Sequence, residues 1–470
     1  MKHARLDGRL VMIGFGSIGQ GVLPLILRHV EIDPARITIL APEAEGAAVA
    51  EGYGVAYEPL ALTRDNLETE LGGRLGAGDF LLNLSVEVSS LALIALCHRA
   101  GALYLDTCIE PWPGGYTDPS TPPAERSNYA LREGALALGR ELGPGPTALI
   151  THGANPGLVS HFVKAALCDA AEAAGRPRPA PAGREEWAAL ARSVGVKAIH
   201  VAERDTQRSR VPREIGEFVN TWSVDGFVGE GCQPAELGWG THERHWPADA
   251  RRHETGSGAA IYLERPGAGT RVRTWTPLEG PFHGFLVTHS ESISLADFLT
   301  LGGPGKAAEY RPTVHYAYHP CDDAVVSLHE LAGKNWHMQD RTRILMDEIL
   351  PGGIDELGVL LMGPGGRAYW YGSRLSVDEA RELVERNNAT SLQVTAAVLA
   401  GVVWALENPD RGVVEPEDMD HVRALEIATP YLGPVVGEWT DWTPLDDRAR
   451  LFPEDLDADD PWQFLNILVR

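Results

Sequence analysis

A glycine-rich turn near the amino terminus is the segment whose residue types and spacing point most directly to chemistry. The apolar run Leu10–Ile13 is followed by Gly14-Phe-Gly16-Ser-Ile-Gly19 and then by an apolar segment that resembles a helix. Gly14 permits a tight turn, Gly16 removes the side chain that would block a pyrophosphate, and Gly19 lets the helix approach the strand. This order predicts the start of a dinucleotide-binding βαβ unit.

The residues that follow this turn bear on which dinucleotide is bound. The helix begins at Ser17 and Ile18, where the first free backbone N–H groups would face the phosphates. An acidic residue about 20 positions further on would hold the ribose hydroxyls. Ala41 stands there, after the strand expected at 37–40, although Glu43 could reach around to the ribose. We expect NAD as the cofactor, with NAD preferred over NADP.

Polar and aromatic residues follow three further apolar runs that are typical of buried parallel strands, at 80–84, 102–105 and 148–150. Ligands of such sheets bind outside the carboxyl ends of the strands. The candidate binding residues at these ends are Ser85, Glu87, Thr107, Glu110, Trp112 and Asn155. Turn or cap roles suit Ser89 and Pro156 well, but they suit the two glutamates and the tryptophan less well.

The order of apolar runs predicts the fold class. Runs typical of strands alternate with amphipathic stretches at 91–99 and 129–142, which predicts an α/β fold with a Rossmann-type doubly wound parallel sheet over residues 1–155. From about residue 195 the chain alternates with period two and carries many aromatics, as at 198–202, 218–222 and 285–289. We therefore expect an inserted mixed-sheet α+β catalytic domain over 156–385.

The remainder of the chain is expected to complete these two parts. The long apolar stretch at 389–404 is rich in small residues and predicts a helix within a segment, 386–430, that returns to the Rossmann domain. A C-terminal extension follows at 431–470.

Composition narrows the function classes. The 470 residues carry a formal net charge of −24, and an acidic field of this kind repels nucleic acid and anionic membranes but attracts cations. The amino terminus lacks an apolar signal region and no uninterrupted apolar run reaches the ~20 residues needed to cross a bilayer, so we expect a cytoplasmic protein. Five scattered cysteines show no spacing typical of a zinc site, and we expect no metal.

Several strings in the second half of the chain are hard to explain as scaffold alone. They are Glu203-Arg-Asp-Thr-Gln207, Glu217-Phe-Val-Asn-Thr-Trp222, Gly229-Glu230-Gly231, Gly238-Trp-Gly-Thr-His-Glu243 and His289-Ser-Glu291. Together with the glycine turn and Gly153-Ala-Asn155-Pro-Gly157, they closely resemble the homospermidine synthases of the bacterial type, which have the saccharopine-reductase-like fold. The resemblance runs from about residue 8 to beyond residue 430.

The resemblance implies an activity that spacing alone does not show. In that family NAD takes a hydride from one putrescine or spermidine, and the amine of a second putrescine attacks the resulting imine. Ammonia leaves, and the new Schiff base takes the hydride back. Such an enzyme is formally an aminobutyl transferase, because the NAD that took the hydride is regenerated at the end of each cycle. The resemblance also implies diamines and polyamines as partners, and a homodimer.

The resemblance assigns roles to several residues. Trp222 would place its ring against the substrate cation, a contact worth about 2 kcal/mol when desolvated. Glu203 and Glu230 would pair with ammonium groups through charge-assisted hydrogen bonds. Asn155 and His289 would lie near the reacting carbon, where His289 could shuttle a proton.

Other residues would complete the site. Glu110 and Trp112 would line the pocket near the nicotinamide, while the side chains expected to contact the cofactor are Ser85, Thr107 and Asn155. Glu291 would follow His289 on the same face of a strand and bind the substrate directly, as would Glu87. Glu87 stands where we expect an aspartate in the family, and its longer side chain leaves the preferred diamine length open.

Ordinary structural roles compete with these assignments. Trp222 could be a core aromatic, the glutamates could be solvated surface charges, and Arg204 offers Glu203 a salt bridge. A saccharopine-reductase or carboxyspermidine-type dehydrogenase would consume NADPH and need an arginine for its substrate carboxylate, for which Arg126 or Arg204 would serve. A cofactor sensor without turnover would keep the glycines but lose the polar strand ends.

Overall fold

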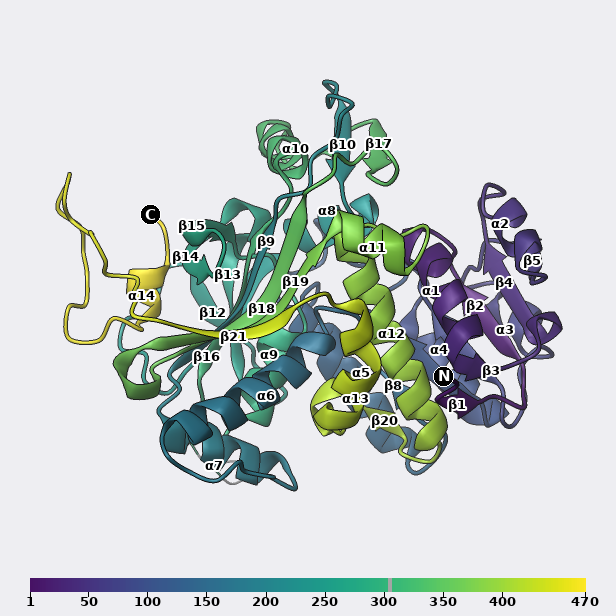
Figure 1. Ribbon diagram of the computed structural model, residues 1–470, viewed down its shortest axis with the longest axis horizontal. Helices are drawn as coiled ribbons and strands as arrows, with labels where there is room; N and C mark the ends of the chain where they lie inside the picture. Colours follow the sequence, from purple (N-terminus) through teal and green to yellow (C-terminus); the bar gives the residue numbers. More distant parts are fainter. Residues whose placement is uncertain (303–306) are drawn as a thin grey trace.

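The computed structural model describes residues 1–302 and 307–470, and its first lobe is built on a seven-stranded parallel sheet, at the right in Figure 1. The strand order is β20-β8-β7-β6-β2-β4-β5. The strands are β2 (Leu10–Ile13), β4 (Ile37–Ala41), β5 (Ala56–Pro59), β6 (Phe80–Asn83), β7 (Leu103–Asp106), β8 (Ala148–Leu149) and β20 (Val413–Val414). The predicted Rossmann-type parallel sheet is thereby confirmed.

Helices connect these strands and cover both faces of the sheet. They are α1 (Ser17–His29), α2 (Ala47–Gly52), α3 (Leu67–Leu71), α4 (Ser90–Ala100) and α5 (Asn128–Leu142). Side-chain oxygens of Ser89 and Ser127 accept backbone N–H groups at the starts of α4 and α5. Strands β2, β6 and β7 are buried along their whole length, as expected for a sheet covered on both sides.

The second lobe contains a ten-stranded mixed sheet, which confirms the predicted second sheet. Its main path runs β12-β13-β11-β16-β9-β18-β19-β21, with β14 and β15 joined beside β16. Only β9 and β16 are parallel neighbours along that path. The strands are β9 (Ala198–Asp205), β11 (Pro234–Gly238), β12 (Ala250–Arg252), β13 (Ala260–Pro266), β14 (Arg271–Thr276), β15 (Gly280–Phe285), β16 (Thr313–His319), β18 (Ile354–Met362), β19 (Ala368–Ser376) and β21 (Val435–Thr440).

Helices and two small strand pairs complete the fold, with one pair beside α1 in the first lobe and the other in the second lobe. The helices are α6 (Leu158–Ala173), α7 (Arg184–Val194), α8 (Val224–Cys232), α9 (Glu291–Phe298), α10 (Asp322–Gly333), α11 (Val377–Leu383), α12 (Ala389–Glu407), α13 (His421–Ala428) and α14 (Phe464–Ile467). The pairs are β1 (Ala4–Arg5) with β3 (Val30–Glu31) and β10 (Glu217–Asn220) with β17 (Arg341–Ile344). The latter pair and α10 form a projection (Figure 1).

Two expected strands differ from the structure. The run at 218–222 lies in the two-stranded pair β10–β17, outside the large sheet, and its strand ends at Asn220. The prediction of a strand over residues 285–289 is wrong. Strand β15 ends at Phe285, where it makes its single pairing with β16, and the chain then leaves the sheet. His289 lies in the following turn and Glu291 begins α9, so they do not share a strand face.

Helix α12 joins the two lobes and packs against α1 and α13 (Figure 1). Gly401 permits a close approach, since a Cβ there would lie 2.6 Å from a methyl group of Leu105 and 2.8 Å from His152 Nδ1. By length and composition α12 could cross a membrane, but 89% of its apolar window is buried inside the fold. We interpret it as a core helix.

The strands at the end of the chain are divided between the lobes. β20 extends the parallel sheet beside β8, and β21 is an edge strand of the mixed sheet beside β19. After β21 the chain extends away from the sheet before it returns to α14 (Figure 1). From β21 onward the chain is packed on the second lobe, whereas Tyr431, before β21, contacts Arg28 and His29 of α1.

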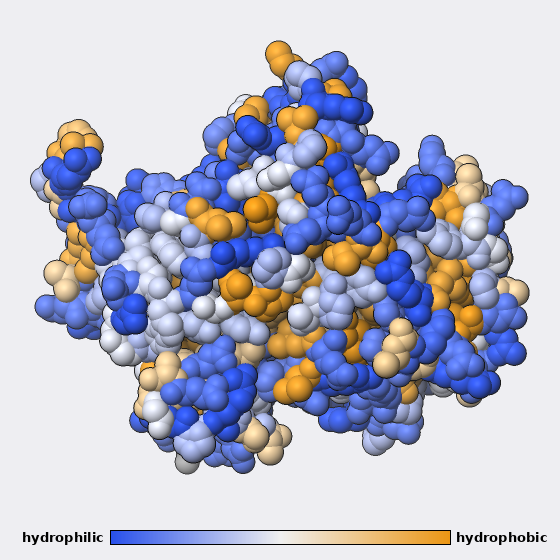
Figure 2. Space-filling view, viewed as in Figure 1, coloured by the Kyte–Doolittle hydropathy of each residue, from blue (hydrophilic) through white to orange (hydrophobic). Residues whose placement is uncertain are grey.

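The visible face in Figure 2 is largely hydrophilic, as the net charge of −24 leads one to expect. Apolar side chains gather near its middle, between α6 and α12. All five cysteines are free thiols. Within residues 1–302 and 307–470, no group of three or more His, Cys, Asp or Glu side chains is arranged so that it could hold a metal ion.

Buried polar contacts hold the two lobes together at α5. The Glu236 carboxylate of β11 accepts the backbone N–H of Asn128 at 2.7 Å and that of Tyr129 at 3.2 Å, at the amino end of α5. One turn further on, Arg132 donates to Glu415 near β20 and to Asp297 of α9. The Arg132 side chain is only 3% exposed.

Replacing Arg132 with alanine should destabilise the protein strongly. The change leaves Glu415 and Asp297 without their buried partner, and such a loss costs about 3–5 kcal/mol of unfolding free energy. Denaturant unfolding monitored by tryptophan fluorescence measures this free energy of unfolding. Arg140→Ala, at an exposed position of the same helix, should change the value by less than about 0.5 kcal/mol. Equal effects of the two substitutions would contradict this account.

Candidate active site

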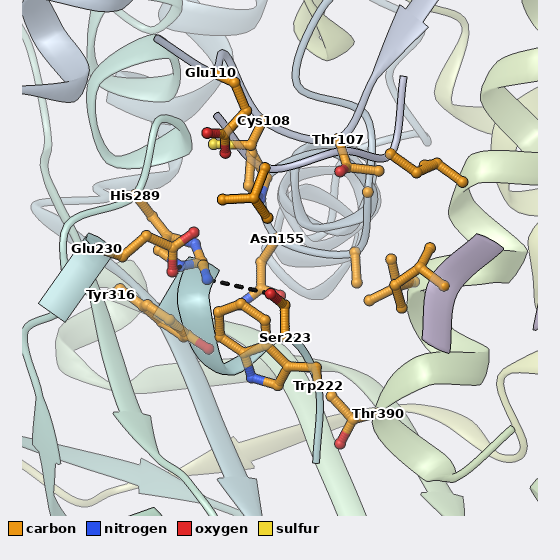
Figure 3. Close-up of a pocket in the computed structure, with 18 of the residues that line it drawn as sticks. Thr107, Cys108, Glu110, Asn155, Trp222, Ser223, Glu230, His289, Tyr316 and Thr390 are labelled. Atoms are coloured by element: carbon orange, nitrogen blue, oxygen red, sulfur yellow. Dashed lines mark hydrogen bonds and ion pairs between the residues drawn. The ribbon is translucent and has the colours of Figure 1, made fainter. Parts of the chain in front are cut away.

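A cavity of about 130 Å³ lies where the two lobes meet. One wall comes from the ends of β6, β7 and β8 and from the start of α1, and the other comes from β9, α8, β16 and α12. Figure 3 shows Glu230, His289 and Tyr316 on one side, Cys108 and Glu110 on another, and Trp222 beneath Asn155. The carboxyl ends of the parallel strands thus face side chains of the second lobe.

The glycine turn leads directly into this cavity. Gly14 has a φ of +85°, and a Cβ there would lie 2.6 Å from the carbonyl oxygen of Leu84. A Cβ on Gly16 would meet no atom within 4 Å, so the space above the start of α1 is open. Ile18 lines the cavity, while Ser17 and Gly19 lie in the first turn of α1 behind it.

Polar residues at the strand ends form the part of the wall nearest to this turn. Ser85 donates to Asn83 Oδ1 at 2.6 Å, and Ser85 and Thr107 both line the cavity. Behind them, Asp106 accepts the backbone N–H of Thr151 and the hydroxyl of Tyr104, each at 2.7 Å. Burial raises the pKa of Asp106 to about 6, against these two hydrogen bonds.

Glu203 projects from β9 into the cavity from the second lobe. Its Oε2 accepts Asn155 Nδ2 at 2.9 Å and also accepts the hydroxyl of Tyr316. Burial raises the pKa of Glu203 to about 8, although both hydrogen bonds favour the charged form. Both donors engage Oε2, which leaves Oε1 for a ligand.

Arg204 does not pair with Glu203. Successive residues of a strand point to opposite faces of the sheet, and Arg204 instead contacts Glu279 at 3.3 Å and Asp322 at 3.4 Å. The expected salt bridge between Arg204 and Glu203 is therefore absent, and among the described residues no arginine or lysine forms an ion pair with the Glu203 carboxylate.

Glu230 and His289 form an ion pair on the same lobe as Glu203, beside the ring of Tyr316. His289 Nε2 lies 3.0 Å from Glu230 Oε2, and Nδ1 lies 3.3 Å from Glu291 Oε1. Burial disfavours the charged imidazolium, but the two carboxylates outweigh it and raise the pKa of His289 well above its ordinary value. His289 is therefore protonated at neutral pH, which argues against its acting as a base in the resting site.

Glu110 lies at the far end of the cavity, after β7. The backbone N–H of Glu87 donates to Glu110 Oε2 at 3.0 Å, and burial raises the pKa of Glu110 to about 8. The Glu87 side chain points elsewhere and only weakly accepts Gly114 N–H, at 3.4 Å. Trp112 packs in a separate core cluster, with Arg64 above its ring at 5.8 Å.

Aromatic rings form the floor of the cavity. Trp222 precedes α8 and is half-buried, and its Nε1 donates to the Tyr318 hydroxyl at 3.3 Å. Tyr318 stacks on Tyr316 with ring centroids 5.0 Å apart, and Tyr316 lies 4.4 Å from the ring of His289. One face of Trp222 is thus available to a ligand while its edge is fixed.

The structure brings together most of the predicted site residues. Those that line the cavity are Ile18, Ser85, Thr107, Glu110, Asn155, Glu203, Trp222, Glu230 and His289. Those outside its lining are Gly14, Gly16, Ser17, Gly19, Glu87, Trp112 and Glu291. Sequence reasoning missed Cys108, Ser223, Tyr316 and Thr390. The alternation Tyr316-Ala-Tyr318 was the signal that two rings share one strand face.

The charges of the lining indicate what the cavity can bind. Among the described residues, the lining contains three glutamates and one histidine but no arginine or lysine. Carboxylates and an exposed aromatic face suit a cationic ligand. A ligand with a carboxylate of its own would find no arginine fork on this wall.

Two domain families match the chain. The saccharopine dehydrogenase NADP binding domain matches residues 10–149, and the saccharopine dehydrogenase C-terminal domain matches residues 153–441. The boundary between the two matches falls directly after β8, where the cavity lies.

Relatives match the chain along its whole length. Homospermidine synthase from Blastochloris viridis is 57% identical over 471 residues and that from Mesorhizobium japonicum is 52% identical over 473, each covering 100% of this chain and 98% of the relative. A crystal structure of homospermidine synthase from Legionella pneumophila in complex with NAD has a TM-score of 0.93 at 51% identity, with 99% and 98% of the two chains covered.

A more distant solved structure shares the fold alone. Apo saccharopine dehydrogenase (L-Glu forming) from Saccharomyces cerevisiae has a TM-score of 0.50 at 11% identity, with 92% of this chain and 100% of that chain covered.

Replacing Glu110 with glutamine should stabilise the protein most at high pH. The pKa is about 8 when folded and about 4.5 when unfolded, so the unfolded chain loses this proton first and stability is lost as pH rises through that window. The melting temperature of Glu110→Gln should exceed that of the wild type by about 2 °C or more at pH 9, and by less at pH 5. Exposed Glu141→Gln is the control; a pH-independent Glu110→Gln effect would show that Glu110 is ionised when folded.

Proposed function

The chain belongs to the homospermidine synthase family, and we propose that it transfers an aminobutyl group from one putrescine, or spermidine, to another putrescine with NAD as the hydride carrier. The cavity between the lobes carries this proposal. It places Glu203, Glu230 and the face of Trp222 opposite the polar ends of the nucleotide-lobe strands, one of which is followed by Glu110. A diamine held there would lie beside the site expected for a nicotinamide.

The chain's own residues fit NAD. The open space at Gly16 and the free N–H groups at the start of α1 would receive the pyrophosphate, and Ser85, Thr107 and Asn155 would border the nicotinamide. When bound, NAD would accept a hydride from the substrate and later return it. The relative from Legionella pneumophila carries NAD in its crystal structure, which supports the same choice here.

The carboxylates would have two different roles: one would accept a proton from the diamine, and the others would bind its charged end. An alkyl amine has a pKa near 10.4 and arrives protonated, so the reacting end must lose a proton while the distal end stays charged. Glu203 has a pKa of about 8 and is mostly protonated at neutral pH until the ammonium group of the substrate favours its ionised form. The ionised carboxylate, with Oε1 unoccupied by the two donors, is suited to accept that proton. Glu230 and Glu110 would receive the charged end, and Trp222 would cover the cation.

The reaction then needs no external reductant. Removal of a hydride from the carbon beside the reacting amine gives an imine, and attack by a second putrescine followed by loss of ammonia gives a new Schiff base. Return of the hydride to that carbon gives the secondary amine. Family membership also leads us to propose a cytoplasmic homodimer without nucleic-acid or membrane partners.

An amino-acid oxidoreductase of the saccharopine-reductase or carboxyspermidine type is less well supported. Its substrate carboxylate would need an arginine, and within the described lining neither Arg126 nor Arg204 takes part. No observation favours that alternative.

Incubation with deuterated putrescine and catalytic NAD tests the proposed reaction. With 1,1,4,4-tetradeuterated putrescine as the only amine, mass spectrometry should show homospermidine that retains all deuterium on its transferred unit, with ammonia released and no net NADH. Stoichiometric loss of NADPH with an amino acid would instead identify the alternative, and no product under either condition would contradict both.

Replacing Trp222 with alanine should weaken use of the diamine. Loss of the cation–π contact, worth about 2 kcal/mol, predicts a fall in kcat/KM of about 30-fold, and Trp222→Phe, which keeps a ring, should lose much less. Steady-state kinetics with putrescine measures both. Trp246→Ala is the control, since Trp246 lies on the surface at 42% exposure. If kcat/KM falls as far in Trp246→Ala as in Trp222→Ala, Trp222 has no specific role in binding the diamine.

A further inference from the structure

The turn that carries His289 leads into α9, whose first residue is a buried carboxylate. Glu291 is fully buried, and neither of its carboxylate oxygens has a hydrogen-bond partner within the described residues. His289 Nδ1, at 3.3 Å, is the cation in contact with it. A carboxylate removed from water without compensation is costly, so the contact with His289 offsets the burial of Glu291.

His289 meets a second carboxylate through its other ring nitrogen. Nε2 lies 3.0 Å from Glu230 Oε2, and Glu230 lines the cavity whereas Glu291 does not. An ionised carboxylate accepts hydrogen bonds and cannot donate them. A ring between two such groups satisfies both only when each nitrogen carries a proton.

The backbone around His289 is also fixed. The N–H of Ser292 donates to the carbonyl oxygen of His289 at 3.1 Å, and the N–H of Ile293 donates to the carbonyl oxygen of Ser290 at 3.0 Å. These bonds form the first turn of α9 and set Glu291 behind His289, on the side away from the cavity.

We propose that Glu291 is a positioning residue that keeps His289 protonated at both ring nitrogens, so that Nε2 donates to Glu230 and holds its carboxylate at the cavity wall. The effect of Glu291 on catalysis rests on the proposed function, in which Glu230 receives an ammonium group. Glu291 then acts on the substrate only through His289 and Glu230. Its expected role as a direct substrate ligand is replaced by this one.

The groups that face His289 come from four elements. They are Glu230 of α8, Glu291 of α9, Tyr316 of β16 and Glu203 of β9. Glu230 and Glu291 raise the pKa of His289 against its burial. Glu291→Gln preserves the shape of the side chain but removes one of those two charges, so the pKa of His289 should fall.

Nuclear magnetic resonance of the protein without substrate measures this directly. The imidazole signal of His289, assigned by its loss in His289→Asn, should titrate well above pH 6.5 in the wild type. In Glu291→Gln it should titrate at a lower pH than in the wild type, and Glu291→Asp should reverse part of this fall. Glu417→Gln, which removes another fully buried carboxylate near α9, is the matched control and should leave the signal unchanged.

Kinetics distinguish this role from a merely structural one. Glu291→Gln should lower kcat for putrescine by about tenfold at pH 9 and by less at pH 7, while Glu417→Gln should keep the wild-type pH profile. A His289 signal that titrates near pH 6.5 in the wild type, or one that Glu291→Gln does not move, would overturn the proposal. If the titrations are as expected but the wild type makes no homospermidine, the proposed function fails while the charge assignment stands.

Discussion

The site depends on carboxyl groups that are buried together with too few cations. Glu110 and Glu203 both have a pKa of about 8, and in each case burial is the main cause. His289 is the positive group on the described lining, and two glutamates already share it. A positively charged ligand is therefore favoured, because its charge stabilises the ionised form of these carboxyl groups, and a diamine supplies positive charge at both ends. The strongly acidic surface would concentrate such ligands before they reach the cavity.

Most of the parallel sheet was predictable from the sequence because β2, β4, β6, β7 and β8 are short, largely apolar runs. The edge strand β5 contains Tyr57 and Glu58 and lacks this signal. The glycine turn was also predictable for a local reason, since Gly14 and Gly16 act within six residues. The separate strings that resemble one family led to Glu203, Trp222, Glu230 and His289, and these four do line one cavity. Their roles in the reaction stay proposals.

Other features depend on contacts between distant segments and were not predictable. Period-two alternation continues past Phe285, but the loss of strand pairing there turns the chain into α9 and moves Glu291 behind His289. Trp112 follows a strand end yet packs against a different core cluster, because the chain turns away before reaching the cavity. Tyr316 reaches Glu203 because β16 and β9 are neighbours, a pairing between segments more than a hundred residues apart.

The way α5 begins has a consequence for the independence of the two lobes. Its first backbone N–H groups are held by Glu236, which belongs to a strand of the other lobe, rather than by Ser127 alone. A nucleotide-binding lobe excised from this chain, or grafted onto a different partner lobe, would start this helix with unsatisfied donors. The two halves are thus not interchangeable modules, and a chimera would have to import the acidic residue along with the helix it receives.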